Sequence, residues 1–254
     1  MQVGIIDNVT RDYLKDANVF ADAFNYLLYK GDSVIKPQNL RTMSTAKLTK
    51  KNGEKELEYV ERTRDLLREV IVQHSIDNGI NYMILGIESQ SYIDYAMPVR
   101  NLLMDAMEYT EQVDNLKLMH ELREDKLEPD EFLSKIKKDD KLKLVITLVI
   151  LFSDKKWDGA RKLSDMLEGM DERTRRYFQD YELNIIEPAE MSDEDFERFH
   201  SNLKDVLKFI KYSGDREQMQ NVLRENSSYR KLTNKAAQVI NICGRLNLQI
   251  PIYN

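Results

Sequence analysis

The sequence predicts an α/β fold, with a short mixed sheet flanked by helices and a helical extension at the C-terminus. Residues 81–90 and 144–152 are apolar segments of the length and aliphatic composition expected for buried strands. Segments with helical spacing of apolar residues surround both. Asn78-Gly79, just before the first apolar segment, is a strong signal for a β-hairpin.

The composition is that of a folded globular protein. The 254 residues suffice for one domain with an appendage or for two small domains. Hydrophobic residues make up 42% and charged residues 32%, which argues against disorder. The formal net charge of −6 argues against broad nucleic-acid affinity, although local basic patches can still bind phosphate.

Nothing in the sequence indicates secretion or membrane insertion. The N-terminal segment lacks a basic start followed by a long apolar core. The longest apolar run, residues 144–152, is far shorter than the roughly 20 residues that span a bilayer. The single cysteine, Cys243, excludes an internal disulfide framework. We therefore expect a cytoplasmic protein with no membrane partner.

The first predicted element is an amphipathic helix over residues 10–30, which ends at Gly31. Its polar face carries Asn18, Asp22 and Asn25 at helical spacing. Two interpretations stay open: the stripe is solvated, or it lines a cleft in which Asp22 assists a metal site. Residues 34–55 are predicted to form a lysine-bearing loop, either solvated or touching phosphate.

Residues 62–67 and 81–90 are predicted to be two strands of one hairpin. If Asn78-Gly79 is a two-residue turn, Glu88 pairs with Glu69; a slip of two residues pairs it with Leu67. Side chains alternate along a strand, so both registers place Asp65, Glu88 and Gln90 on one face. An odd register would separate them.

The rest of the chain reads mainly as helices around the second strand. The predicted helical segments are residues 97–113, 114–141, 161–170, 195–225 and 231–246. The apolar stripe of the first of these is formed by Leu102, Leu103, Ala106, Met107 and Thr110. Trp157, in a turn, is interpreted as a packing residue, with base stacking as the alternative.

Asp65, Glu88 and Gln90 form the candidate catalytic site. Carboxylates are natural ligands for Mg²⁺, so Asp65 and Glu88 are predicted to bind it, and the Ser89 carbonyl could add a ligand. Gln90 can orient a water molecule but carries no positive charge. Arginine suits phosphate, and the arginines expected to supply that charge and contact DNA are Arg62, Arg64, Arg68 and Arg100.

These residues lie in segments that resemble a known family. The resemblance is carried by ANVFADAFNYLL, RTRDLLREV, NYMILGIESQ, AMPVRNLLMDAMEY, KLVITLVILFSDKKWDG and NIIEPAEMSDEDFERF. Together they resemble the recombination-promoting nuclease family of transposase-like proteins, within the PD-(D/E)XK nuclease superfamily. The similarity covers roughly residues 17–211, and its most specific pieces are RDLL, LGIE-x-Q and the apolar strand followed by Trp-Asp-Gly.

The resemblance implies Mg²⁺-dependent DNA cleavage associated with recombination or transposition. Asp65 takes the place of the motif aspartate, Glu88 of the motif acid and Gln90 of the motif lysine, where the family often carries glutamine. The first helix of the family commonly adds an acidic residue, for which Asp22 is the nearest candidate, although the usual His-Asp start is absent.

The sequence changes character after residues 181–186, which suggests a division of the chain into two parts. A nuclease-like sandwich is expected over residues 1–190 and a helical extension over residues 191–254. DNA is the expected partner, no organic cofactor is expected, and a homo-oligomer is left open. The alternative functions are a nuclease-fold binding module without turnover and a purely helical interaction protein.

Overall fold

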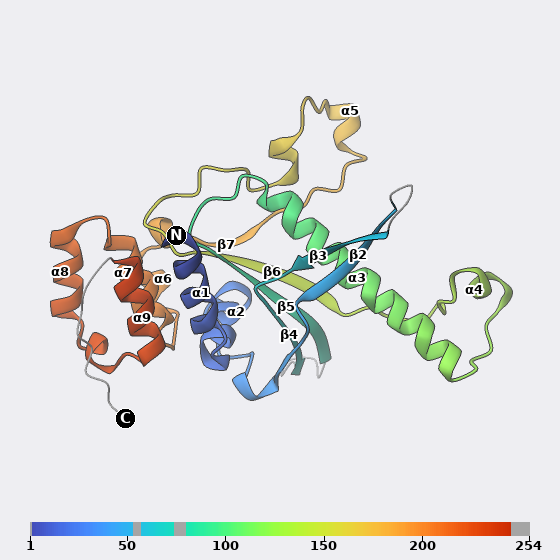
Figure 1. Cartoon of the computed structure of the whole chain (residues 1–254), viewed down its shortest axis with the longest axis horizontal. Coiled ribbons are helices and arrows are strands. Elements are labelled where there is room, and N and C mark those ends of the chain that lie inside the picture. Colours follow the sequence, from blue (N-terminus) through green and yellow to red (C-terminus); the bar gives the residue numbers. More distant parts are fainter. Residues whose placement is uncertain (1, 53–56, 74–79, 245–254) are drawn as a thin grey trace.

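The structure, a computed structural model, describes residues 2–52, 57–73 and 80–244. Its centre is a five-stranded mixed sheet (Figure 1) with the order β1-β4-β5-β6-β7. The bounds of these strands are β1 Leu40–Thr42, β4 Leu66–Gln73, β5 Ile80–Gln90, β6 Leu144–Leu151 and β7 Asn184–Ile186. Pairing is antiparallel from β1 to β5 and parallel from β5 to β7. The sheet excludes a purely helical protein.

A second, two-stranded sheet lies beside the first. It pairs β2 (Ala46–Asn52) with β3 (Leu57–Thr63) in antiparallel fashion. The predicted loop over residues 34–55 therefore contains β1 and β2. The predicted strand over residues 62–67 is likewise divided, because the chain leaves β3 at Thr63 and bends before it enters β4.

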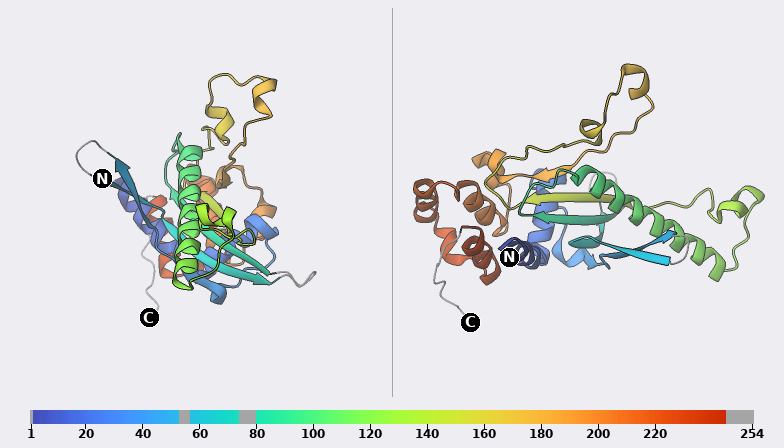
Figure 2. Two further views of the ribbon diagram at one scale, coloured as in Figure 1. Left: turned by 90° about the vertical axis from the view of Figure 1, so that its right-hand side faces the viewer. Right: turned by 45° about the horizontal axis from the view of Figure 1, so that its top comes forward.

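Helices lie on both faces of the large sheet (Figures 1 and 2). The α-helices are α1 Gln2–Leu14, α2 Ala17–Tyr29, α3 Met97–Leu122, α4 Pro129–Ser134, α5 Glu172–Arg175, α6 Asp193–Glu197, α7 Leu203–Tyr212, α8 Arg216–Glu225 and α9 Asn234–Cys243. Short 3₁₀ helices are η1 Pro37–Asn39, η2 Leu163–Met166, η3 Pro188–Glu190 and η4 Ser227–Lys231.

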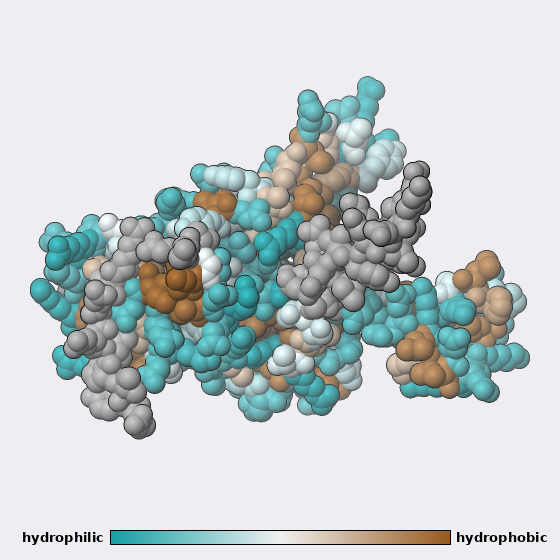
Figure 3. Space-filling view, viewed as in Figure 1, coloured by the Kyte–Doolittle hydropathy of each residue, from teal (hydrophilic) through white to brown (hydrophobic). Residues whose placement is uncertain are grey.

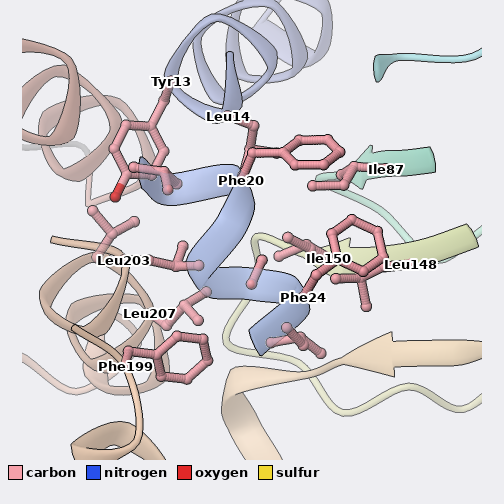
Figure 4. Packing of buried hydrophobic residues seen from close by; sticks show 14 of the residues in the cluster. Tyr13, Leu14, Phe20, Phe24, Ile87, Leu148, Ile150, Phe199, Leu203 and Leu207 are labelled. Atoms are coloured by element: carbon pink, nitrogen blue, oxygen red, sulfur yellow. The ribbon is translucent and has the colours of Figure 1, made fainter. Parts of the chain in front are cut away.

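The main hydrophobic core lies between the sheet and the helices α1, α2, α7 and α9. Phe20 and Phe24 of α2 are fully buried and pack toward the sheet, while Leu203 and Leu207 of α7 close the other side (Figure 4). Because α7 and α9 belong to the same cluster as the sheet, the predicted boundary at residue 190 passes through one continuous core.

The opposite face of the sheet is covered by α3, which buries a polar side. Asn101, Asp105 and Glu108 are buried together with Met104. The predicted apolar stripe of this helix points outward instead, and Leu103 is 40% exposed. The predicted stripe is wrong because Asp105, on the polar side of α3, forms a buried ion pair with Arg64 and therefore faces the sheet.

The β4–β5 hairpin has a register that differs from both predicted ones. Leu66 pairs with Ile87 and Gln73 with Ile80, so the two-residue turn is wrong and residues 74–79 lie outside the described part. The slip from the first predicted register is four residues, an even number. Because side chains alternate between the two faces of a strand, this even difference leaves Asp65, Glu88 and Gln90 on the same predicted face.

Two of the predicted helices are also divided differently. The helix expected over residues 10–30 is two helices, because Asp16 accepts a hydrogen bond from the backbone N–H of Asn18 and begins α2. Its predicted end is confirmed: Lys30 and Gly31 both have positive φ after the last turn. In the segment 114–141, α3 stops at Leu122 and only α4 follows.

Candidate functional site

The predicted site lies where β5 ends, beside the bend formed by Arg64 and Asp65 before β4. Extending the observed register by one residue places Asp65 opposite Glu88. The backbone N–H of Ser89 donates a 2.8 Å hydrogen bond to Oδ2 of Asp65. The side chain of Asp65 is thus held against the strand that carries Glu88.

Glu88 is a fully buried carboxylate with unequal surroundings at its two oxygens. Oε2 accepts a 2.9 Å hydrogen bond from Nη2 of Arg100, at the start of α3. Oε1 is buried and has no hydrogen-bond partner within the described part of the chain. Burial raises the pKa of Glu88 to about 7; Arg100 opposes the increase and the Asp65 carboxylate adds to it.

Gln90 closes β5 two residues beyond Glu88, so both side chains leave the same face of the strand. Its side chain is half-buried, and its carbonyl accepts a 2.7 Å hydrogen bond from the N–H of Phe152. Gln90 therefore lies at the end of β5, and the hydrogen bond from Phe152, just after β6, fixes its backbone.

Helix α1 contributes residues that sequence reasoning missed. Arg11 Nε lies 2.9 Å from Oδ1 of Asp65, and Asp7 accepts a 2.5 Å hydrogen bond from Ser91 Oγ. Thr10 accepts one of 2.7 Å from Ser89 Oγ. Asp7, Thr10 and Arg11 follow the i, i+3, i+4 spacing of one helix face, and this spacing was the available signal.

Arg64 is buried and does not face solvent, so its predicted role as a DNA contact is wrong. Its Nη2 lies 2.8 Å from Oδ1 of Asp105, and it also bonds Thr147. Tyr181 donates a 2.6 Å hydrogen bond to the other oxygen of Asp105. The guanidinium passes over Gly86, where an added Cβ would lie 2.2 Å from Nη1.

Arg68 is corrected for a similar reason. It is 7% exposed, lies over the ring of Phe20 at 4.6 Å from the centroid, and donates to the carbonyl of Lys15. It therefore belongs to the helix-packed core. The backbone of Arg62 pairs with Lys47 in the small sheet, and its side chain lies outside the described residues. Of the three predicted arginines whose side chains the structure describes, only Arg100 is brought to the predicted site.

Asp22 does not join the site. Its carboxylate is 5% exposed and accepts hydrogen bonds from the backbone N–H groups of His200 and Ser201 and from Ser201 Oγ. Asn25 is also buried and bonds both backbone groups of Ile35, whereas Asn18 is exposed. Asp22 and Asn25 thus hold other segments of the chain in place through hydrogen bonds. Neither predicted interpretation, a solvated stripe or a cleft with a metal site, describes these two side chains.

Asp65 and Glu88 are the two carboxylates at this site that could hold a divalent cation with few protein ligands. Within the described ranges, no group of three or more His, Cys, Asp or Glu side chains could hold a metal ion. Mg²⁺ is commonly bound through one or two carboxylates while it keeps several waters. The unsatisfied oxygen of buried Glu88, beside a second carboxylate, is the feature such a cation would satisfy.

Two other candidates have structural roles. Trp157 is 5% exposed and its Nε1 donates to the carbonyl of Ala160 at 3.3 Å, so the packing interpretation is confirmed. Burial raises the pKa of the Cys243 thiol to about 12, which keeps it unreactive.

A comparison with protein families decides the affiliation of the chain. Residues 39–239 match the family described as "Putative transposase, YhgA-like". The chain belongs to this family. Its matched segment contains Asp65, Glu88, Gln90 and Arg100, whereas Arg11 precedes it. Membership in the YhgA-like family indicates a transposition-related, DNA-processing function.

Other comparisons add no further relatives. No curated protein and no solved structure matches the chain significantly. None of the described helices combines the length and the apolar character needed to cross a membrane.

Proposed function

We propose that this member of the YhgA-like family is a Mg²⁺-dependent DNA endonuclease of the PD-(D/E)XK type that acts in transposition or recombination. The observation that carries the proposal is the pairing of Asp65 with the strand of Glu88. Glu88 is a buried carboxylate whose Oε1 has no partner among the described residues. Buried carboxylates of this kind are costly for a fold and are typical of functional sites.

The strand arrangement supports this assignment. An antiparallel hairpin, β4–β5, is followed by helix α3 and by β6, which pairs with β5 in parallel. Asp65 precedes the first strand and Glu88 and Gln90 end the second. This arrangement is compatible with the α/β sandwich that the family resemblance implies.

Asp65 and Glu88 would hold the cation, with the Ser89 carbonyl as a further ligand. A bound Mg²⁺ supplies Lewis-acid stabilisation of the charge that develops on the phosphate. The amide of Gln90, on the same strand face as Glu88, would orient the attacking water. The backbone N–H of Ser89 keeps Asp65 in position through its 2.8 Å hydrogen bond.

Arg100 is the best candidate for the positive charge that Gln90 lacks. Its side chain is 41% exposed and lies between Glu88 and Asp94, with Nη1 3.5 Å from Asp94 Oδ2. With a cation held by Asp65 and Glu88, the guanidinium of Arg100 would be available to contact a DNA phosphate. Arg11, also 41% exposed, forms an ion pair with Asp65 and would be available to a DNA phosphate in the same way. An arginine fork suits phosphate oxygens.

The experiment is cleavage of supercoiled plasmid DNA in Mg²⁺ by the wild type and by Asp65→Ala and Glu88→Ala. The wild type should nick or linearise the plasmid, and both variants should not. Glu69→Gln is the matched control: Glu69 lies on β4, pairs with Lys143 and does not contact the site. Equal cutting by the wild type and both site variants would remove Asp65 and Glu88 from the mechanism.

A second candidate is a nuclease-fold module that binds DNA or protein without turnover. The ion pairs that Arg11 and Arg100 make with the two carboxylates favour it, because they already neutralise the charges a cation would need. This candidate predicts DNA retention in a gel shift, with no cleavage in Mg²⁺, Mn²⁺ or Ca²⁺.

A further inference from the structure

The end of α3 and the segment with α4 form an arm that projects beyond the sheet (Figures 1 and 2). We call residues 118–141 the distal arm. All residues of 121–141 are described, and none of their side chains is buried. A helix as short as α4, with no buried residue, has little stability of its own in water. The distal arm therefore lacks the hydrophobic core that normally holds such a segment.

Polar contacts hold the distal arm together. His120 is the buried residue at its base: Nδ1 lies 2.7 Å from Asp125 and Nε2 lies 2.8 Å from Asp140. Lys137 adds a 3.0 Å ion pair with Asp125. These contacts define the path of the chain, yet they leave its apolar side chains in solvent.

Large apolar side chains are exposed on both helices of the distal arm. On α3 they are Leu118, Met119 and Leu122, of which Leu122 is 75% exposed. On α4, Phe132 is 68% and Leu133 is 91% exposed. Figure 3 shows apolar side chains gathered at this projecting end. Clustered exposed apolar residues on a polar surface mark an interaction site.

The charges of the distal arm indicate what covers it. The start of α4 is acidic, and the segment 135–138 that follows the helix is basic. The acidic residues are Glu128, Asp130 and Glu131, and the basic ones are Lys135, Lys137 and Lys138. In a two-fold contact whose axis is perpendicular to α4, the helix lies antiparallel to its own copy. The acidic start of each helix then meets the basic end of the other, so the surface is complementary to itself.

We propose that the distal arm is a homodimer interface, in which Leu122, Phe132 and Leu133 pack against the same residues of a second copy. This inference goes beyond the proposed nuclease function and does not depend on it. The site at Glu88 and the distal arm lie toward opposite ends of α3, because Arg100 precedes His120 by 20 residues, about 30 Å along a helix.

Sedimentation velocity from nanomolar to high micromolar concentration tests the proposal. The full-length wild type should be a dimer at the upper end, and Phe132→Glu combined with Leu133→Glu should be a monomer throughout. Both positions are exposed, so the circular dichroism spectrum and the melting temperature of the variant should stay near those of the wild type at a concentration where the wild type is monomeric. Tyr177→Glu changes a 75% exposed residue outside the distal arm and should leave the dimer intact.

Charge reversal tests the antiparallel arrangement. Asp130→Lys and Lys138→Glu should each raise the dissociation constant roughly tenfold. The double variant should recover dimerisation, because the pair is restored with opposite sign. A wild type that is monomeric at every concentration overturns the proposal. A dimer that persists in the variant with Phe132→Glu and Leu133→Glu also overturns it. So does a variant with both Asp130→Lys and Lys138→Glu that dimerises more weakly than either single charge variant.

Discussion

The backbone N–H of Ser89 donates a hydrogen bond to the carboxylate of Asp65 across the β4–β5 junction. This contact joins the bend before β4 to the end of β5, and it holds one carboxylate beside the strand that carries the other. The position of Asp65 therefore depends on a backbone donor that no substitution of residue 89 except proline removes.

Asp65→Ala and Asp65→Asn should separate the structural role of Asp65 from its chemical role. Alanine leaves the Ser89 N–H without its acceptor, which should lower the free energy of unfolding by about 1–3 kcal/mol. Asparagine keeps an acceptor oxygen and should remain close to the wild type. Urea denaturation measures both. Equal loss of stability in the two variants would mean that charge, not the hydrogen bond, anchors Asp65.

Glu88→Gln should stabilise the protein in EDTA at alkaline pH. The pKa of Glu88 is raised from 4.5 to about 7, so the folded protein keeps a proton that the unfolded chain releases. Wild-type stability therefore falls as the pH rises from about 4.5 to about 7 and is level above that range. The change corresponds to about 3 kcal/mol at most.

Denaturant titrations at pH 5 and pH 8 check this sign. The stability difference between Glu88→Gln and the wild type should be small at pH 5 and large at pH 8. A wild type more stable than the variant at pH 8 without metal would show that the Arg100 ion pair outweighs the cost of burying the charge.

Gly86→Ala should be strongly destabilising. A Cβ at this position would lie 2.2 Å from Arg64 Nη1, so the guanidinium must leave Asp105 or the strands must separate. Breaking a buried ion pair costs about 3–5 kcal/mol. Gly4→Ala is the matched control, because a Cβ there meets nothing within 4 Å and α1 should gain slightly. Equal melting temperatures for Gly86→Ala and Gly4→Ala would show that Arg64 can move away from Gly86 without loss of stability.

His120 should titrate above its ordinary pKa of 6.5, because hydrogen bonds to Asp125 and then Asp140 favour the charged ring. A raised folded-state pKa means that the stabilisation is fully present below pH 6.5 and is lost as the pH rises through the folded-state value. NMR titration of the His120 ring gives the pKa, and Asp125→Asn should lower it. Hydrogen exchange in residues 121–141 should quicken over the same pH range.

The hairpin illustrates what the sequence could predict. Asn78-Gly79 suggested a tight turn, and the turn register was wrong. The buried residues Leu66 and Val70 pair with Ile87 and Met83, which shows that strand packing determined the register instead. Because side chains alternate with a period of two, an even slip moved Glu88 from Glu69 to the position opposite Asp65 and left the predicted face unchanged.

Long-range contacts account for what the sequence could not predict. Arginines are mostly exposed, so Arg64 and Arg68 were expected at the surface. Their partners, Asp105 and Phe20, lie far away along the chain, and no local pattern connects them. Helical spacing places Arg11 on one face with Asp7 and Thr10, but only the packing of α1 against β5 brings that face to Asp65.

Crystals soaked in Mn²⁺ provide the most direct measurement, because Mn²⁺ replaces Mg²⁺ at oxygen ligands and its position is visible in an anomalous difference map. We expect one peak within coordination distance of carboxylate oxygens of both Asp65 and Glu88, with Arg100 displaced from Glu88. A map without a peak there, in which the Arg11–Asp65 and Arg100–Glu88 ion pairs persist, would contradict the proposed metal site.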